Sequence, residues 1–440
     1  MLDKLKGIQG SHIVKRVTNA VGSVRPKGKQ SSDKYIIGLD IGTENVKALI
    51  GRVTEAGAEV VGVGRAHQGL MDMQAGAISD ITGVVTNCDK ALAEAEKQAG
   101  VSVRSAVIGI AGELVKGTTT TVKCTRKNPS KPLDLPEVEK IIGLVQDRSQ
   151  KKAKQELAWE LGGKDVEIRL VNSALVGIEI DGYPVTNPIG FQGKEVLVQL
   201  YTAFAPMIHI GALERVATEL DLDLVAVAAE PFAVARSVIG NDSNANMSAI
   251  LMDCGGGTSD IAVVDEGGVQ GTKMFGIGGR AFTRSIERGL GVTYEDAEQL
   301  KLALSSDRIA PQKRAAVEKV LSKTLDVWLS GVELALGEFD KLDHLPHRLL
   351  LCGGASSLDM LVERLEQSNW YKNLPFARKP IIQHIQPEQV VGIKDVTDSI
   401  TDHTFITAMG LLRVGLDTMQ QGVEPGAGTI RDKIDRMLRA

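Results

Sequence analysis

Cysteine, aromatic residues and long apolar runs are all scarce in this chain of 440 residues. The four cysteines form no C-x-x-C pair, which argues against a zinc site or a disulfide framework and favours a reducing, cytoplasmic setting. Aromatic residues make up only 4% of the chain and its net charge is −4, so no nucleic-acid partner is expected. No apolar run is long enough to span a bilayer, and the first residues lack the apolar core of a signal peptide.

Several common catalytic motifs are also missing. There is no G-x-x-x-x-G-K-[ST] phosphate loop and no G-x-S-x-G hydrolase turn, and GIGGRAF does not fit the G-x-G-x-x-G dinucleotide fingerprint. The length exceeds what one hydrophobic core supports, so two or more domains are expected. Strand-like and helix-like segments alternate along most of the chain, which predicts an α/β protein. One of these segments, from Asp80, predicts a helix that Gly100 ends.

One short motif is present twice, as IIGLDIGTENVKALIG and as LMDCGGGTSDIAVV. Its glycines let backbone N–H groups approach a phosphate, and consecutive N–H groups form an anion-binding concavity. The hydroxyls of Thr43 and Thr258 can donate to phosphate oxygens, while Asp40 and Asp253 suit a hydrated Mg²⁺. Either motif alone could be a plain hairpin. Together they predict two turns that clamp a nucleotide polyphosphate from both sides of a cleft.

A third glycine pair, Gly353 and Gly354 in LLLCGGASSL, lies between a predicted strand and a predicted helix. Without side chains, this turn allows a flat base or a sugar to approach closely. A plain strand-to-helix turn is the alternative.

These three motifs resemble the two phosphate motifs and the adenosine motif of the actin, Hsp70 and sugar-kinase superfamily. AVAAEPFAVARSV and FITAMGLLRVG resemble its two connecting helices. Within it, the chain is similar to the bacterial cell-division FtsA family from about Tyr35 onward, through IDGYPVTNPIGFQGKEVLVQLYTAFAP and FGIGGRAFTRSIERGLGVTYEDAEQLKLAL. The resemblance implies an actin-like (ribonuclease H-like, duplicated) two-domain ATPase fold of the α/β class, with an inserted α+β subdomain.

The pattern of strand-like and helix-like segments changes along the chain, and together with the resemblance it predicts the following organisation. The expected parts are a basic arm at 1–34, a first actin-like domain at 35–112, 196–240 and 401–416, an inserted subdomain at 113–195, a second actin-like domain at 247–282 and 346–400, its helical subdomain at 283–345, a linker at 417–428 and an amphipathic helix at 429–440.

The resemblance further implies ATP with Mg²⁺ between the two halves. Asp40 and Asp253 match the metal-facing aspartates. Glu230 matches an acid that orients attacking water, with a plain charge at a helix N-terminus as the equal alternative. The expected nucleotide-binding positions are Gly42, Thr43, Glu44, Asn45, Lys47, Gly255, Gly256, Gly257, Thr258, Gly278, Gly279, Glu298, Lys301, Gly353, Gly354 and Ala355. Whether the chain is an enzyme stays open, and any ATP hydrolysis is expected to be slow.

Both ends of the chain are basic. In TIRDKIDRMLRA the apolar positions share one helical face and basic residues flank it, which predicts a membrane-surface helix. Its lipid-contacting residues would be Ile430, Arg431, Lys433, Ile434, Met437 and Leu438. A helix docked on its own domain is the alternative. The first 34 residues hold eight Lys or Arg against two Asp, and could be a lipid contact, a partner-binding arm or a solvated tail.

The resemblance implies a function at the division site. It implies an ATP-binding protein, peripheral on the inner face of the cytoplasmic membrane, that polymerises and anchors filaments of tubulin-like FtsZ. Its partners would be an FtsZ-like protein, copies of itself, other division proteins and an anionic membrane surface. Two alternatives stay open: a PilM-type scaffold of type IV pilus assembly, and a small-molecule kinase of the same superfamily.

Overall fold

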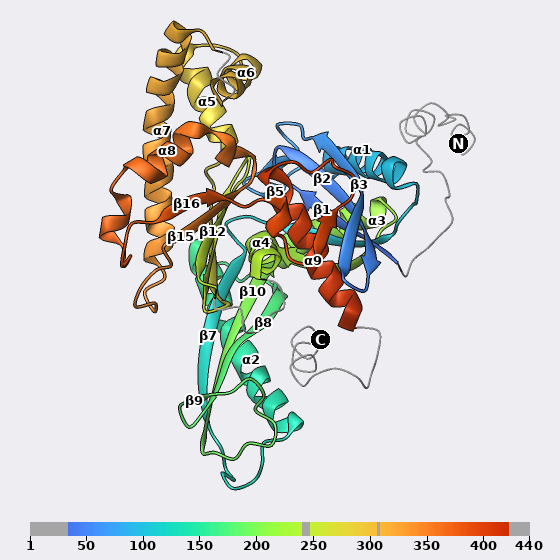
Figure 1. The fold of residues 1–440 in the computed structure, drawn as a ribbon, viewed down its shortest axis with the longest axis vertical. Helices are drawn as coiled ribbons and strands as arrows, with labels where there is room; N and C mark the ends of the chain where they lie inside the picture. Colours follow the sequence, from blue (N-terminus) through green and yellow to red (C-terminus); the bar gives the residue numbers. More distant parts are fainter. Residues whose placement is uncertain (1–33, 240–246, 306–308, 422–440) are drawn as a thin grey trace, which may run out of the picture.

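The fold is described from a computed structural model, which covers residues 34–239, 247–305 and 309–421. Figure 1 shows one sheet drawn mainly in blue, a second sheet that carries orange and yellow helices, and a teal and green extension that projects away from both. Residues 1–33 and 422–440 lie outside the described part, so the predicted N-terminal arm, apart from its last residue, and the predicted membrane helix at 429–440 lie outside it too.

The first sheet combines an antiparallel meander with parallel strands. Its order is β11 (Asp223–Ala229), β6 (Ser105–Ile110), β1 (Tyr35–Ile41), β2 (Asn45–Thr54), β3 (Gly57–His67) and β17 (Ile393–Asp395). Strands β1, β2 and β3 are antiparallel, whereas β6, β11 and β17 run parallel to their neighbours. Around it pack α1 (Ile81–Ala99), α3 (Met207–Glu219) and α9 (Ile406–Gln421). As predicted, α1 begins after Asp80, whose carboxylate accepts the N–H of Thr82, and ends at Gly100.

The second sheet has nine strands and continues into the inserted subdomain. Its order is β16 (Ile381–His384), β15 (Arg348–Cys352), β12 (Ala249–Cys254), β13 (Ser259–Asp265), β14 (Gly268–Phe275), β7 (Lys116–Thr125), β10 (Glu195–Pro206), β8 (Ile168–Ile180) and β9 (Tyr183–Pro184). The meander β12–β13–β14 repeats that of β1–β2–β3. Its helices are α5 (Gly279–Leu290), α6 (Tyr294–Ser305), α7 (Pro311–Gly337) and α8 (Asp359–Gln367). A small hairpin, β4 (Met73–Gln74) and β5 (Ala77–Ile78), follows the first meander.

The inserted subdomain packs α2 (Leu135–Glu160) on β7, β8 and β10 around a small core of its own. Strand β10 contributes to two cores, because Val198 and Leu200 belong to this small core while Tyr201 and Ala203 belong to the large core shared by the first half and part of the second. The sequence assigns 196–240 to the first domain, yet β10 lies in the nine-stranded sheet. Likewise β17, within the range assigned to the second domain, pairs with β3 of the first sheet.

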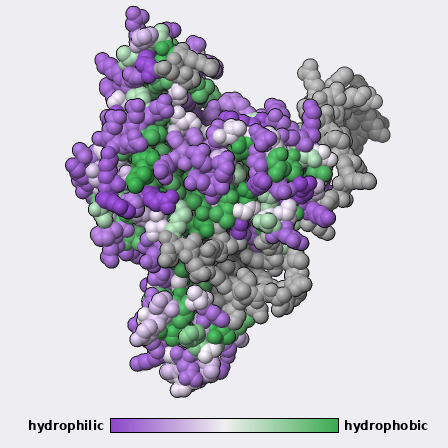
Figure 2. All heavy atoms as spheres, viewed as in Figure 1, coloured by the Kyte–Doolittle hydropathy of each residue, from purple (hydrophilic) through white to green (hydrophobic). Residues whose placement is uncertain are grey.

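Helices α4 (Glu230–Ile239) and α9 pack on each other where the two halves meet (Figure 1). Asp417 of α9 is almost fully buried and accepts from Arg236 of α4 at 2.8 Å and from Arg413 at 3.0 Å, which ties the two helices together. The face drawn in Figure 2 is mainly hydrophilic, with hydrophobic residues gathered near its middle. Among the helices of the described ranges, none is both long and apolar enough to cross a bilayer.

Candidate nucleotide-binding cleft

The two repeated motifs form two hairpins of the same build, one from each sheet. In the first, Asp40 stands opposite Lys47 across β1 and β2. In the second, Asp253 stands opposite Asp260 across β12 and β13. The turns touch each other, because a Cβ atom added to Gly257 would lie 2.6 Å from the Thr43 hydroxyl oxygen. Two symmetric turns therefore meet at the bottom of one cleft between the halves.

The cleft between the hairpins has a volume of about 210 Å³. Most of the residues that the sequence predicts for nucleotide, metal and catalysis line it. These are Asp40, Gly42, Thr43, Glu44, Asn45, Lys47, Glu230, Asp253, Gly255, Gly256, Thr258, Gly279, Glu298, Lys301, Gly353, Gly354 and Ala355. Gly257 and Gly278 do not line it, since Gly257 faces Thr43 and Gly278 faces the carbonyls of the second glycine turn.

A group of buried carboxyl groups lies at the centre of the cleft. Burial, together with the charges of Asp40, Asp260 and Asp253, raises the pKa of Glu230 well above its usual range. Burial and the neighbouring Asp253 likewise raise the pKa of Asp260, and burial raises that of Asp253 itself. Burial lowers the pKa of Lys47, but Asp40 and Asp253 more than offset this, so the ammonium stays charged. Lys47 thus faces a group of four acids, and this arrangement favours a further cation.

The acids fit a hydrated metal better than a metal held by protein alone. No group of three or more His, Cys, Asp or Glu side chains in the described ranges is placed to hold a metal ion by itself. Mg²⁺ commonly takes only one or two carboxylates, with waters and phosphates as its other ligands. Asp260 Oδ1 is buried and lacks a hydrogen-bond partner among the described residues. A water on such an ion would satisfy this oxygen, so the residues present fit Mg²⁺ bound to a nucleotide.

The start of α5 supports the second hairpin. The N–H groups of Gly279 and Arg280 donate to the carbonyls of Gly255 and Gly256, at 2.9 and 2.8 Å. Lys301 of α6 donates to the Gly279 carbonyl at 3.2 Å and pairs with Glu298 at 2.8 Å. Gly278 and Gly279 therefore hold the second hairpin in position, whereas Glu298 and Lys301 line the cleft.

The turn at Gly353 closes the cleft beside the second hairpin. Its backbone adopts φ 82° and ψ 157°, which a residue with a side chain rarely adopts. A Cβ atom there would lie 2.0 Å from Asp253 Oδ1, so the turn and the aspartate are in direct contact. The N–H of Gly353 donates to the carbonyl of His403 at 3.3 Å, and the His403 ring stacks on that of His384 with centroids 4.1 Å apart.

Three functional residues of the cleft are missed by the sequence reasoning. Asp260 is identifiable in retrospect, because it occupies the place in the second hairpin that Lys47 occupies in the first. Arg280 has no local signal: it lines the cleft from the second half and donates from Nε to Glu44 of the first half at 2.8 Å. Thr407 of α9 donates its hydroxyl to Asp253 and lowers the pKa that burial raises.

The histidine pair makes stability depend on pH. Burial and the neighbouring His384 lower the pKa of His403 from 6.5 to about 4 in the folded protein. Between these pH values the unfolded chain binds more protons, so the free energy of unfolding falls as the pH drops from 6.5 and levels off below about 4. Because the ring is half-buried, we expect a loss of about 1 kcal/mol. Urea unfolding of wild type and His403→Gln at pH 7.5 and 5.0 measures it; equal pH slopes would contradict the assignment.

Two sheets with repeated hairpins facing one cleft define an actin-like fold, as the sequence predicts. A solved structure with this architecture is that of the PilM-PilN type IV pilus biogenesis complex. It aligns with a TM-score of 0.61 at 15% identity, covering 87% of this chain and 98% of that chain. At this identity the likeness concerns the fold alone.

Comparison with known sequences shows which group of actin-like proteins this chain resembles. A family model described as Cell division protein FtsA matches residues 250–410. Cell division protein FtsA of Pseudomonas aeruginosa is 26% identical over 417 residues, covering 89% of this chain and 92% of that protein. FtsA of Bacillus subtilis is 25% identical over 278 residues, covering 62% and 59% of the two chains. The chain is therefore related to the FtsA cell-division proteins, which confirms the resemblance that its motifs predict.

Proposed function

We propose that this chain is an ATP-binding cell-division protein that polymerises and anchors FtsZ-like filaments to the inner face of the cytoplasmic membrane. Its relatedness to FtsA supports the cellular role. The observation that supports nucleotide binding is that two glycine hairpins, with Asp40 and Asp253, meet in one cleft. Other division proteins and further copies of the chain would be its partners, at the division site.

In this proposal the two turns hold the phosphates of ATP, and Asp40 and Asp253 face its Mg²⁺. The metal would neutralise phosphate charge. Glu298 and Lys301 lie on the second half, where they would flank the ribose and base. Glu230 lines the cleft, where it would orient an attacking water, and burial together with Asp40, Asp260 and Asp253 raises its pKa well above the usual range. Any ATP hydrolysis is expected to be slow, and ATP would serve to set the relation between the halves.

Membrane attachment is assigned to residues 429–440, on sequence alone. Burying Ile430, Ile434, Met437 and Leu438 in the lipid interface would contribute on the order of 6 kcal/mol at most. Nearby arginine and lysine residues would add about 1 kcal/mol each on an anionic surface. A single helix of this size binds weakly, so polymerisation would strengthen attachment by multivalency.

Co-sedimentation with anionic liposomes in ATP tests the anchor. We expect the full chain to sediment and a chain lacking residues 429–440 to lose most of that binding. A chain lacking residues 1–33 is the control, because the arm is also basic, and it should still sediment. Binding that survives loss of the helix but not of the arm would move the anchor to the N-terminus. Absence of binding in every form would overturn the tether and favour the PilM-type scaffold.

A further inference from the structure

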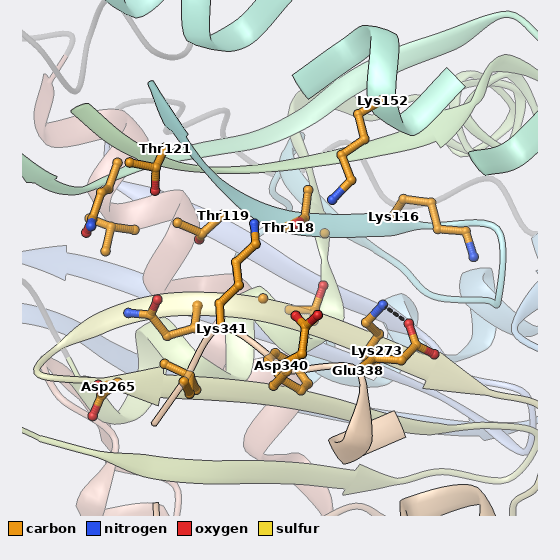
Figure 3. Close-up of a pocket in the computed structure, with 18 of the residues that line it drawn as sticks. Lys116, Thr118, Thr119, Thr121, Lys152, Asp265, Lys273, Glu338, Asp340 and Lys341 are labelled. Atoms are coloured by element: carbon orange, nitrogen blue, oxygen red, sulfur yellow. Dashed lines mark hydrogen bonds and ion pairs between the residues drawn. The ribbon is translucent and has the colours of Figure 1, made fainter. Parts of the chain in front are cut away.

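A groove of about 1280 Å³ lies away from the nucleotide cleft. Figure 3 shows β7 and α2 of the inserted subdomain along one side, with β14 and the segment after α7 along the other. Lys152 points into the groove from α2, and Lys341 reaches toward β7 from the opposite wall (Figure 3). The groove therefore separates the subdomain from the second half, and an occupant would contact both.

The groove opens where two strands of the continuous sheet diverge. Strands β7 and β14 pair at only two positions, Thr118 with Gly271 and Gly117 with Thr272. One further contact, from the Thr119 hydroxyl to the Val269 carbonyl at 2.6 Å, marks the last point of approach. Beyond it β7 is paired with β10 on its other side, and within the described ranges no strand covers the edge facing the groove. An open strand edge is a template for an added strand.

The charge of the groove selects a basic occupant. Eight aspartate and glutamate residues and four lysines line it, a formal balance of −4. Three of the lysines are already paired, Lys116 with Glu160 at 2.8 Å, Lys152 with Glu156 at 3.6 Å and Lys273 with Glu338. Exposed acids on the second-half wall, Glu266 and Asp340, form no ion pair with a described residue.

The rim of the groove also offers apolar surface. The Trp159 side chain at the end of α2 is 83% exposed, and aromatic faces of this kind attract lysine and arginine. Val115, Phe339 and Leu342 contribute to the lining. An extended segment that combines β-branched and basic residues would complement the edge, the acids and this apolar surface.

The chain carries such a segment. Residues 1–33 hold seven Lys or Arg and two Asp, a formal charge of +5, and residues 13–17 read Ile-Val-Lys-Arg-Val. From residue 17 to the start of β1 the chain can extend about 60 Å. A compact chain of this length has a radius of gyration of about 22 Å, so the extended segment is longer than two such radii. Tethering also gives it an effective concentration near the millimolar range, which favours its own chain over another copy.

We propose that residues 13–17 dock in this groove of their own chain as an added strand along the free edge of β7. The docked arm bridges the inserted subdomain and the second half, and it keeps the groove closed to other segments. The inference goes beyond the proposed function and does not rest on nucleotide or membrane binding.

Peptide titration tests the proposal. A fluorescent peptide of residues 1–33 is titrated into the full chain and into the chain lacking those residues, with anisotropy as the readout. The shortened chain is expected to bind the peptide at least tenfold more tightly, because its groove is free. Lys15→Glu with Arg16→Glu in the peptide should remove binding. Val17→Pro keeps the charge but deletes a strand N–H, and should also weaken it. Equal affinity of the two chains, or no peptide binding at all, would overturn the proposal.

Groove variants locate the site. Glu266→Lys with Asp340→Lys in the shortened chain should reduce affinity at least tenfold. Glu139→Lys, an exposed α2 position outside the groove lining, is the matched control and should not. Hydrogen exchange of the amides of Thr120–Thr125 should be slower in the full chain than in the shortened one. A full chain that forms dimers lost on removing the arm would show that the arm binds another copy, and would overturn docking within the chain.

Discussion

Gly353→Ala is expected to destabilise the protein by about 4 kcal/mol, from a strained backbone and an overpacked site. The substitution keeps a backbone at φ 82° and places a Cβ 2.0 Å from Asp253 Oδ1 and 2.6 Å from the Cys254 carbonyl oxygen. The turn cannot shift without moving Asp253, which we propose faces the metal. Affinity for a fluorescent ATP analogue should fall about 100-fold, since each tenfold step corresponds to about 1.4 kcal/mol. Urea unfolding and analogue titration measure the two effects.

The adjacent glycine is the matched control. A Cβ atom added to Gly354 would meet no heavy atom of the protein within 4 Å, so Gly354→Ala should leave stability nearly unchanged. If both variants behave alike, the close contact of the Gly353 turn with Asp253 does not govern the site. If Gly353→Ala loses stability but keeps its nucleotide affinity, the turn is structural and adenosine binds elsewhere.

Arg280→Ala is expected to cost about 3 kcal/mol, because it removes a buried cation that joins the halves. Only 8% of the residue is exposed, and its guanidinium donates to Glu44 at 2.8 Å. It also donates to the carbonyls of Leu70 at 3.2 Å and of Gly69 and Met73 at 3.3 Å. Alanine would leave the carboxylate and three carbonyls without this partner. The midpoint of urea unfolding reports the loss, and faster release of a bound ATP analogue should accompany it.

Two further variants separate charge from geometry at this position. Arg280→Lys keeps the charge but cannot form the planar fork, so it should recover less than half of the loss. Arg284→Ala, an exposed arginine of the same helix, should stay within about 0.5 kcal/mol of wild type. An Arg280→Ala protein as stable as Arg284→Ala would mean that the halves are held together without this bridge.

The local parts of the site could be predicted from sequence. Each of these parts depends on residues that are close together in the sequence: the glycine turns, their aspartates and the helix that ends at Gly100. Within such short segments, hydrophobic periodicity and turn residues indicate the local structure directly. The position of Asp260 could also have been predicted, because the two hairpins have the same length and Asp260 corresponds to Lys47. The actin-like fold followed from the resemblance that these motifs carry.

Contacts between distant segments could not be predicted in this way. Arg280 and Glu44 are 236 residues apart, and Thr407 and Asp253 are 154 apart. No periodicity links such pairs, since their meeting depends on how the sheets assemble. The place of β10 was missed for a related reason: both its faces are buried, so its sequence does not say to which sheet its backbone bonds.

A crystal structure with Mg²⁺ and a non-hydrolysable ATP analogue would show whether the cleft binds a nucleotide. We expect the triphosphate between the turns at Gly42 and Gly256, with the metal facing Asp40 and Asp253. We also expect the adenosine to lie against Gly353 and beside Lys301. A nucleotide bound elsewhere, or a cleft that stays empty at saturating analogue, would contradict this expectation.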